Sequence, residues 1–172
     1  MSRPYYDPTV ETTTTLRAHL AQHVLAKGFQ LGSLIGVGAA APTMALLSRS
    51  LSLPNALRTA GIASLVGTTA TGALLVAKMQ GMDRVGLEDR VLRLHYNEGQ
   101  NRVDALSFWG SALGTGGAVA IARLGLVRMS TLHLMGGGAA GCAAAVLYHV
   151  ATKPPKNLTM SMDIIKDQVT AK

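Results

Sequence analysis

Charged residues, aromatic residues and cysteine are all scarce in this chain. Charged side chains make up 15% of its 172 residues and aromatic side chains 4%, whereas soluble domains carry about 25% charged residues. The single cysteine, Cys142, excludes an intramolecular disulfide and any cysteine-based zinc or iron–sulfur site, because these need several thiolates. Glycine is frequent, at 19 residues. A chain rich in glycine but poor in charge has the composition of membrane helices.

The net charge of +7 does not indicate a nucleic-acid partner. The basic residues are scattered, and few aromatic side chains are present to stack on bases. The first fifteen residues contain Asp7 and Glu11 but no apolar run. We therefore expect neither a cleavable secretory signal nor an arginine-rich mitochondrial presequence.

Long uncharged stretches are the clearest feature of the sequence. Four of them occupy residues 28–48, 59–77, 105–122 and 129–152. Each approaches the roughly 20 residues with which a helix crosses the hydrocarbon core of a bilayer. Buried helices of a soluble protein would instead show a charged or polar face. The sequence therefore predicts an all-α fold, an integral membrane bundle of four transmembrane helices with short interfacial helices.

We expect three regions along the chain: an N-terminal extramembrane segment at 1–27, a four-helix membrane domain at 28–152, and a C-terminal extramembrane tail at 153–172. Four spans place both termini on one side, together with the charged loop at 78–104. The other side then holds two short loops, 49–58 and 123–128, which contain no acidic residue. Because the positive-inside rule gives weight to short loops, we predict that these two loops lie on the electrically negative side.

Small residues recur at every fourth position of each span, a spacing that lets helix backbones approach closely. The span at 59–77 is only weakly hydrophobic, with four threonines, so we expect protein to cover it on more than one side. Pro42 should kink the first span or remove one backbone hydrogen bond. The predicted helix-packing residues are Gly32, Gly36, Ser64, Thr68, Gly72, Gly110, Gly114, Gly137 and Gly141.

Two extramembrane helices are also predicted. One covers 15–30, with Thr13 or Thr14 as its N-cap, and runs directly into the first span. The other lies within the charged loop, where apolar residues share one helical face and opposite charges stand four apart. These residues are Leu87, Val91 and Leu94, with the pairs Asp89–Arg93 and Glu98–Arg102.

No group of residues predicts catalysis. The glycine run at 136–141 matches a dinucleotide-binding pattern, but it lies inside a span without a preceding strand, so we interpret it as packing. His19 and His23 have the spacing of metal ligands but no third partner, which favours an ordinary interfacial helix. His133 and His149 lie near opposite ends of the last span. We expect no enzyme, no cofactor and no metal site.

The stretch 88–104 carries more hydrogen-bonding side chains than a solvated loop needs. A charged surface loop and a docking element for a partner subunit or lipid headgroups are both open interpretations. The residues predicted to dock a partner or lipid are Arg49, Arg58, Arg90, Arg93, His95, Tyr96, Arg102, Arg123 and Arg128.

The four small-residue-rich spans and the short basic loops after the first and third spans resemble the mitochondrial inner-membrane translocase (Tim) superfamily, over roughly residues 20–152. The segment 87–104 also resembles a block in small membrane proteins of algae and protists. The sequence departs from the translocase pattern in its long charged central loop and in lacking a clear presequence-translocase signature.

This resemblance implies a mitochondrial inner-membrane protein with both termini in the intermembrane space. It further implies a structural accessory subunit of a respiratory assembly, with complex I as the first candidate and other membrane subunits and lipid as partners. A structural phospholipid such as cardiolipin is the one bound molecule that it suggests, and no small-molecule substrate is expected. The alternative is a protein-translocase or solute-pore component.

Overall fold

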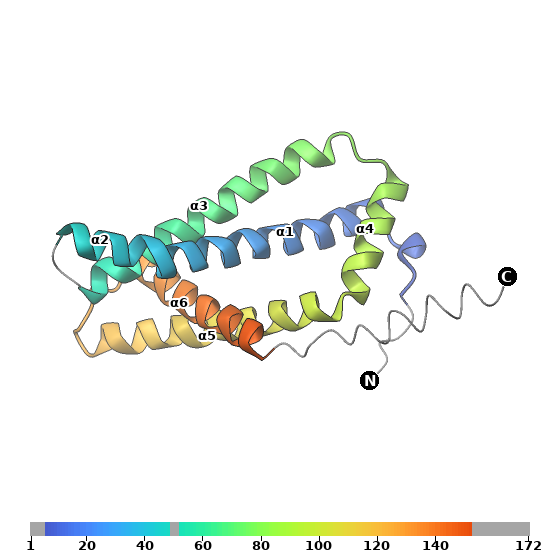
Figure 1. Ribbon diagram of the computed structural model, residues 1–172. Coiled ribbons are helices and arrows are strands. Elements are labelled where there is room, and N and C mark those ends of the chain that lie inside the picture. The colour runs from blue at the N-terminus through green and yellow to red at the C-terminus, as the bar shows by residue number, and fades with distance from the viewer. Residues whose placement is uncertain (1–5, 49–51, 153–172) are drawn as a thin grey trace.

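The computed structural model describes residues 6–48 and 52–152. Helices dominate it and are connected by short loops (Figure 1). In chain order they are the short 3-10 turn η1 (Pro8–Val10), α1 (Thr13–Ile35), the π-helical segment η2 (Gly36–Ala40), α2 (Ala41–Ser48), α3 (Leu53–Met79), α4 (Arg84–Tyr96), α5 (Glu98–Arg123) and α6 (Thr131–Ala151).

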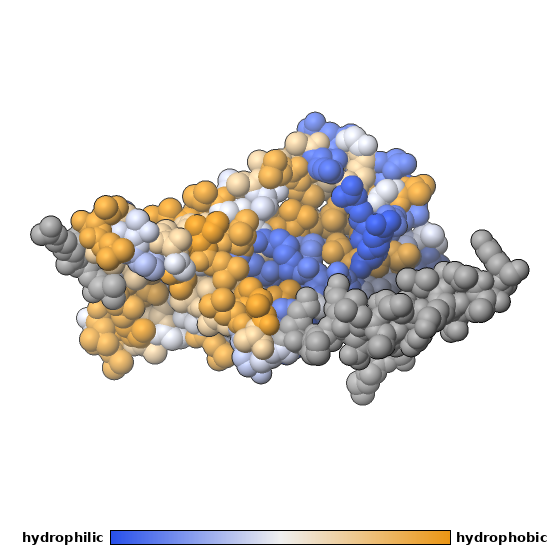
Figure 2. Space-filling model, viewed as in Figure 1, coloured by the Kyte–Doolittle hydropathy of each residue, from blue (hydrophilic) through white to orange (hydrophobic). Residues whose placement is uncertain are grey.

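The predicted all-α fold with four spans is confirmed. Four helical stretches are long and apolar enough to cross a membrane: Thr13–Leu47, Leu53–Met79, Glu98–Arg123 and Thr131–Ala151. Several extend past the uncharged windows because a charged residue at a membrane boundary does not interrupt backbone hydrogen bonding. Figure 2 shows apolar surface over much of the bundle, with hydrophilic side chains gathered toward the end where α4 lies. The chain is a multi-pass membrane protein.

The helix predicted at 15–30 continues directly into the first span, as predicted, because Thr13–Leu47 is one continuous helical stretch. Its N-cap prediction was wrong, since the cap is Thr12 rather than Thr13 or Thr14. The Thr12 hydroxyl accepts a hydrogen bond from the Thr15 backbone N–H at 3.2 Å. Four consecutive threonines allow several cap positions, and the extended backbone at Thr12 places the helix start one residue earlier.

The spans pack in the order α1, α3, α6, α5, and α1 also contacts α6. The outermost helix, α5, packs mainly on α6. The short helix α4 lies across the N-terminal half of α1 (Figure 1). Leu87 and Val91 of α4 are buried there against Leu16 and Leu20 of α1. The predicted apolar face of α4 therefore packs against α1.

The region of Pro42 departs from regular α-helix. Residues Gly36–Ala40 form a π-helical turn, and α2 continues directly from it. Proline cannot donate a backbone hydrogen bond, so the carbonyl one turn earlier needs another partner, and a local π-turn is one way to accommodate this. The predicted disturbance at Pro42 thus takes the form of changed hydrogen-bond spacing.

Candidate functional site

The seam between α1 and α3 is built from backbone contacts. A Cβ placed on Gly32 would clash with the backbone of Ala63 and Ser64, and one on Gly36 would lie 2.9 Å from the Ala60 Cα. A Cβ on Gly67 would lie 3.0 Å from the Gly32 Cα. Only glycine allows the two helix backbones to lie this close together, so the helices make dispersion contacts along their backbones.

A second seam joins α5 to α6 in the same way. Gly110 faces the Gly141 carbonyl, and Gly114 faces the Gly137 carbonyl. Gly72, in contrast, lies near only the Leu25 side chain, 3.2 Å from where its Cβ would be. Thr68 uses its hydroxyl to bond the Ser64 carbonyl of its own helix at 2.8 Å.

The contact of α3 with α6 depends on Gly61, which was not among the predicted packing residues, and on Gly136, which belongs to the glycine run interpreted as packing. A Cβ on Gly136 would clash with the Leu57 carbonyl, and one on Gly61 would clash with the Leu132 carbonyl. Gly136 opens the run of three glycines in the last span. Three adjacent glycines expose backbone on more than one helix face, which was the available signal for a second neighbour.

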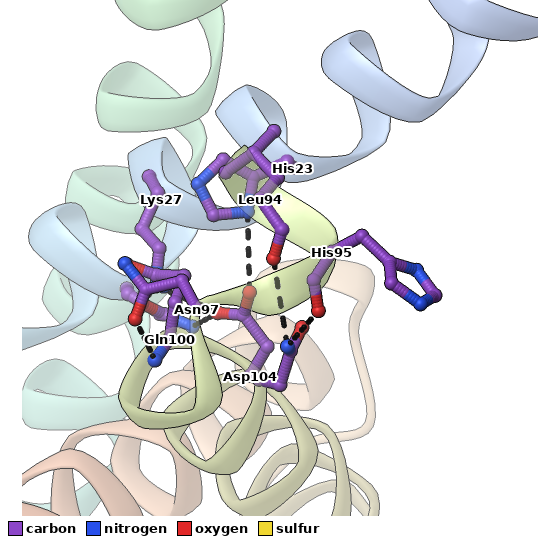
Figure 3. Close-up of polar contacts among 9 residues, drawn as sticks. His23, Lys27, Leu94, His95, Asn97, Gln100 and Asp104 are labelled. Atoms are coloured by element: carbon purple, nitrogen blue, oxygen red, sulfur yellow. Dashed lines mark hydrogen bonds and ion pairs between the residues drawn. The ribbon is translucent and has the colours of Figure 1, made fainter. Parts of the chain in front are cut away.

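A polar cluster, hereafter the Asp104 cluster, links α1 to α5 (Figure 3). The Lys27 ammonium donates to Asp104 Oδ1 at 2.6 Å, and the Gln30 amide donates to the same oxygen at 2.9 Å. The Gln100 amide also reaches Oδ1, at 3.2 Å, while His23 Nδ1 lies 3.2 Å from Oδ2. The cluster therefore consists of His23, Lys27, Gln30, Gln100 and Asp104.

Helical periodicity brings these groups together. His23, Lys27 and Gln30 follow one another at four and three residues along α1, so they share a face. Gln100 and Asp104 stand four apart on α5. The carboxylate is surrounded by donors and partnered by a cation, an arrangement that fixes two helices relative to each other and leaves little basicity for proton abstraction.

A cavity of about 370 Å³ borders the Asp104 cluster, and its lining includes Tyr6, His23, Leu94 and Asp104. The Tyr6 ring stacks on His95, with ring centroids 4.4 Å apart. Burial, and secondly the carboxylate of Glu11, raise the pKa of Tyr6 to about 12. Tyr6 is therefore a neutral phenol at physiological pH, and its uncharged ring forms part of one wall of the cavity.

Most of the docking candidates in the central segment contact this chain itself. Arg93 pairs with Asp89 at 3.0 Å. The Tyr96 hydroxyl accepts a hydrogen bond from the Tyr6 backbone N–H at 3.2 Å. Arg102 donates to the carbonyl and hydroxyl of Thr152, at 3.2 and 2.8 Å, and not to Glu98. Arg90 is exposed on α4.

Three of the remaining docking candidates lie at the opposite end of the bundle, where the short loops are (Figure 1). Arg58, in the second turn of α3, is exposed, as are Arg123 at the end of α5 and Arg128 in the next loop. Arg49 lies outside the described residues. The structure thus separates the candidates into a polar end, largely engaged within the chain, and a basic end.

The histidines at metal-ligand spacing turn to different carboxylates. His19 lies 3.6 Å from Glu11, whereas His23 lies 3.2 Å from Asp104. Within residues 6–48 and 52–152, no three His, Cys, Asp or Glu side chains are grouped to hold a metal ion. His133 contacts the Ser130 hydroxyl at 2.6 Å, at the N-terminus of α6.

Comparison with known proteins gives one family. Residues 9–151 match the family described as "Protein of unknown function (DUF1757)". No curated protein matches the chain. The family match covers nearly all of the residues described above, from the N-terminal turn to the end of α6, so the chain belongs to this family.

Proposed function

We propose that this DUF1757 protein is a non-catalytic structural subunit of a larger membrane assembly, and that it braces neighbouring membrane subunits through helix contacts. The observation that carries the proposal is the outer face of α5, which no other helix of the described chain covers. Only 11% of the most apolar window of α5 is buried, against 39% for α6.

The α5 outer face repeats the spacing of the internal seams. Gly110 and Gly114 of α5 are used against α6, but a Cβ on Gly116 or Gly117 would meet no atom within 4 Å. The exposed residues that form the face are Ala105, Phe108, Trp109, Ala112, Leu113, Gly116, Gly117 and Ala120.

The composition of this face suits packing against a partner helix better than contact with lipid tails. Ala112, Gly116 and Ala120 stand at four-residue spacing, which allows a second backbone to approach as closely as in the internal seams. Phe108 and Trp109 are each 66% exposed beside this stripe. Large aromatic side chains flanking a small-residue groove are suited to anchor a partner helix.

The resemblance to the mitochondrial inner-membrane translocase superfamily suggests which assembly this is. We propose a respiratory complex of the mitochondrial inner membrane, with complex I first, and other membrane subunits as partners. The charge of the short-loop end supports this placement. Its exposed residues include Arg58, Arg123 and Arg128. In this orientation the short basic loops face the matrix, and the end with α4 faces the intermembrane space.

The pore alternative has less support. The candidates to line an aqueous path are His133 and the threonines of α3, but three of these threonine hydroxyls donate to carbonyls within their own helix. Thr68 bonds Ser64 at 2.8 Å, Thr69 bonds Leu65 at 2.9 Å, and Thr71 bonds Gly67 at 3.0 Å. A hydroxyl satisfied by its own backbone is less available to a passing solute.

Native gel electrophoresis of solubilised membranes tests the proposal. The wild-type chain should migrate with a large complex, and Gly116→Leu should release it, because a leucine on the small-residue stripe of α5 would hold the partner backbone away. Loss of a central helix contact of about 2 kcal/mol corresponds to roughly 30-fold weaker association.

Gly38→Leu is the matched control. A Cβ on Gly38 also meets no atom within 4 Å, but Gly38 lies in η2 rather than on α5. That variant should stay in the complex. Migration of the wild type only as a small free oligomer would contradict the proposal. Equal release of the two variants would remove α5 as the docking helix.

A further inference from the structure

A cleft of about 550 Å³ opens at the short-loop end of the bundle, between α2 and the first turns of α3. Small and apolar side chains form most of its wall, among them Val37, Met44, Leu57 and Ile62. Arg58 is the single charged side chain in the lining, and Ser52 and Asn55 lie beside it in the sequence and also line the cleft. The cleft therefore combines an apolar wall with a cationic group.

The cleft exists because the seam between α1 and α3 ends at Gly36. Up to that residue the two backbones are in contact, with the Gly36 Cβ position 2.9 Å from the Ala60 Cα. Beyond it the chain becomes π-helical, and a Cβ on Gly38 would meet no atom within 4 Å. Pro42 and Ala45 of α2 then face α3 across open space as lining residues.

The charge at the short-loop end of the bundle favours an anionic ligand in the cleft. The sequence holds no acidic residue between Glu11 and Asp83, or between Asp104 and Asp163. Both short loops and all the helix ends beside them are therefore free of negative charge. Arg58 also lies in the second turn of a 27-residue helix capped by Ser52, where the helix dipole adds positive potential.

We infer that this cleft binds a phospholipid with an anionic headgroup. One acyl chain lies against the apolar wall, and the phosphate pairs with the Arg58 guanidinium at the membrane surface. An acyl chain matches the wall because a cleft on a membrane helix opens toward hydrocarbon, and a guanidinium is well suited to a phosphate. The site needs only the membrane setting, so it stands apart from the proposed subunit role.

Photolabelling of the full-length chain in lipid vesicles tests this inference. The probes are phosphatidylglycerol and phosphatidylcholine carrying the same photoreactive acyl chain, each diluted into phosphatidylcholine vesicles. With the wild type, phosphatidylglycerol should label α2 and the start of α3 more strongly than phosphatidylcholine does. Arg58→Gln should lower the phosphatidylglycerol labelling about fivefold, the factor expected for one basic residue at an anionic surface.

Arg123→Gln is the matched control, because Arg123 belongs to the same basic end but does not line the cleft. It should leave the labelling unchanged. A second pair tests the apolar wall: Ala45→Phe fills the cleft and should reduce labelling by both probes. The neighbouring Leu46→Phe should not, since Leu46 is 80% exposed and does not line the cleft.

Three outcomes would overturn the inference. Equal losses in Arg58→Gln and Arg123→Gln would indicate diffuse attraction to a basic surface. Equal labelling of the wild type by both probes would remove the headgroup selectivity. Competition by millimolar inorganic phosphate would show an anion site without an acyl chain. Thermal unfolding of each variant in the same vesicles distinguishes lost lipid binding from lost folding. Because Arg58 is exposed, Arg58→Gln should fold, and its comparison with Arg123→Gln stays valid even if Ala45→Phe unfolds.

Discussion

Replacing Gly141 with alanine should destabilise the bundle by about 3 kcal/mol, at the upper end of the cost of inserting one group into a packed interface. The added Cβ would clash with the Gly110 carbonyl oxygen and lie 3.1 Å from the Gly114 Cα. Both neighbours are backbone atoms, so the clash cannot be relieved by rotating a side chain. The two helices must separate, which weakens the dispersion contacts along the whole seam.

Reversible unfolding in mixed micelles, followed by the fluorescence of the single tryptophan, Trp109, measures this effect. Gly117→Ala on α5 is the matched control, because its Cβ would meet no atom within 4 Å. That substitution should be neutral or stabilising by up to about 1 kcal/mol, since alanine is the better helix former. Equal destabilisation by the two variants would show that the seam does not hold the bundle together.

The helices could be predicted from the sequence because membrane crossing requires an uncharged stretch of defined length. The window at 59–77 lies inside α3 (Leu53–Met79), and the window at 129–152 contains α6 (Thr131–Ala151) with one or two residues to spare at each end. Pairing was harder to predict. Four-residue spacing places Gly110 and Gly114 on one face, but the spacing alone does not identify α6 as the neighbour.

Helices that pack against two neighbours also limited the prediction of contacts. Gly61, Gly67 and Gly136 lie in close backbone contacts, yet they fall outside the four-residue series that the sequence makes visible. A helix with two neighbours needs small residues on two faces, and a single series describes only one. Conversely, Gly72 belongs to a series but meets only the Leu25 side chain, because a seam ends where the helices diverge.

The Asp104 cluster was missed because each of its charges also marks the end of a span. Lys27 and Asp104 bound the uncharged windows of the first and third spans, and that role alone explained their presence. Both spans start on the same side of the membrane, which was the available signal that the two charges lie at the same level. Their lateral distance depends on helix packing, which the sequence pattern does not determine.

Replacing Asp104 with asparagine should cost about 2 to 3 kcal/mol of stability, because it leaves the Lys27 ammonium without its carboxylate. Breaking a fully buried ion pair costs about 3–5 kcal/mol. The Asp104 and Lys27 side chains are 29% and 30% exposed, so solvent reduces the penalty. The same unfolding assay measures it, and a widened distance between spin labels on α1 and α5 would report that the two helices have separated.

Asp89→Asn is the matched control. Its ion pair with Arg93 joins residues four apart on one helix, and the side chains are 51% and 78% exposed, so its loss should change stability by about 0.5 kcal/mol or less. The double variant Lys27→Met with Asp104→Leu should recover most of the stability lost by Asp104→Asn, because it removes both charges instead of leaving one unpaired. If the double variant is as unstable as the single one, the cluster acts through its hydrogen bonds to Gln30 and Gln100 rather than through the charge pair.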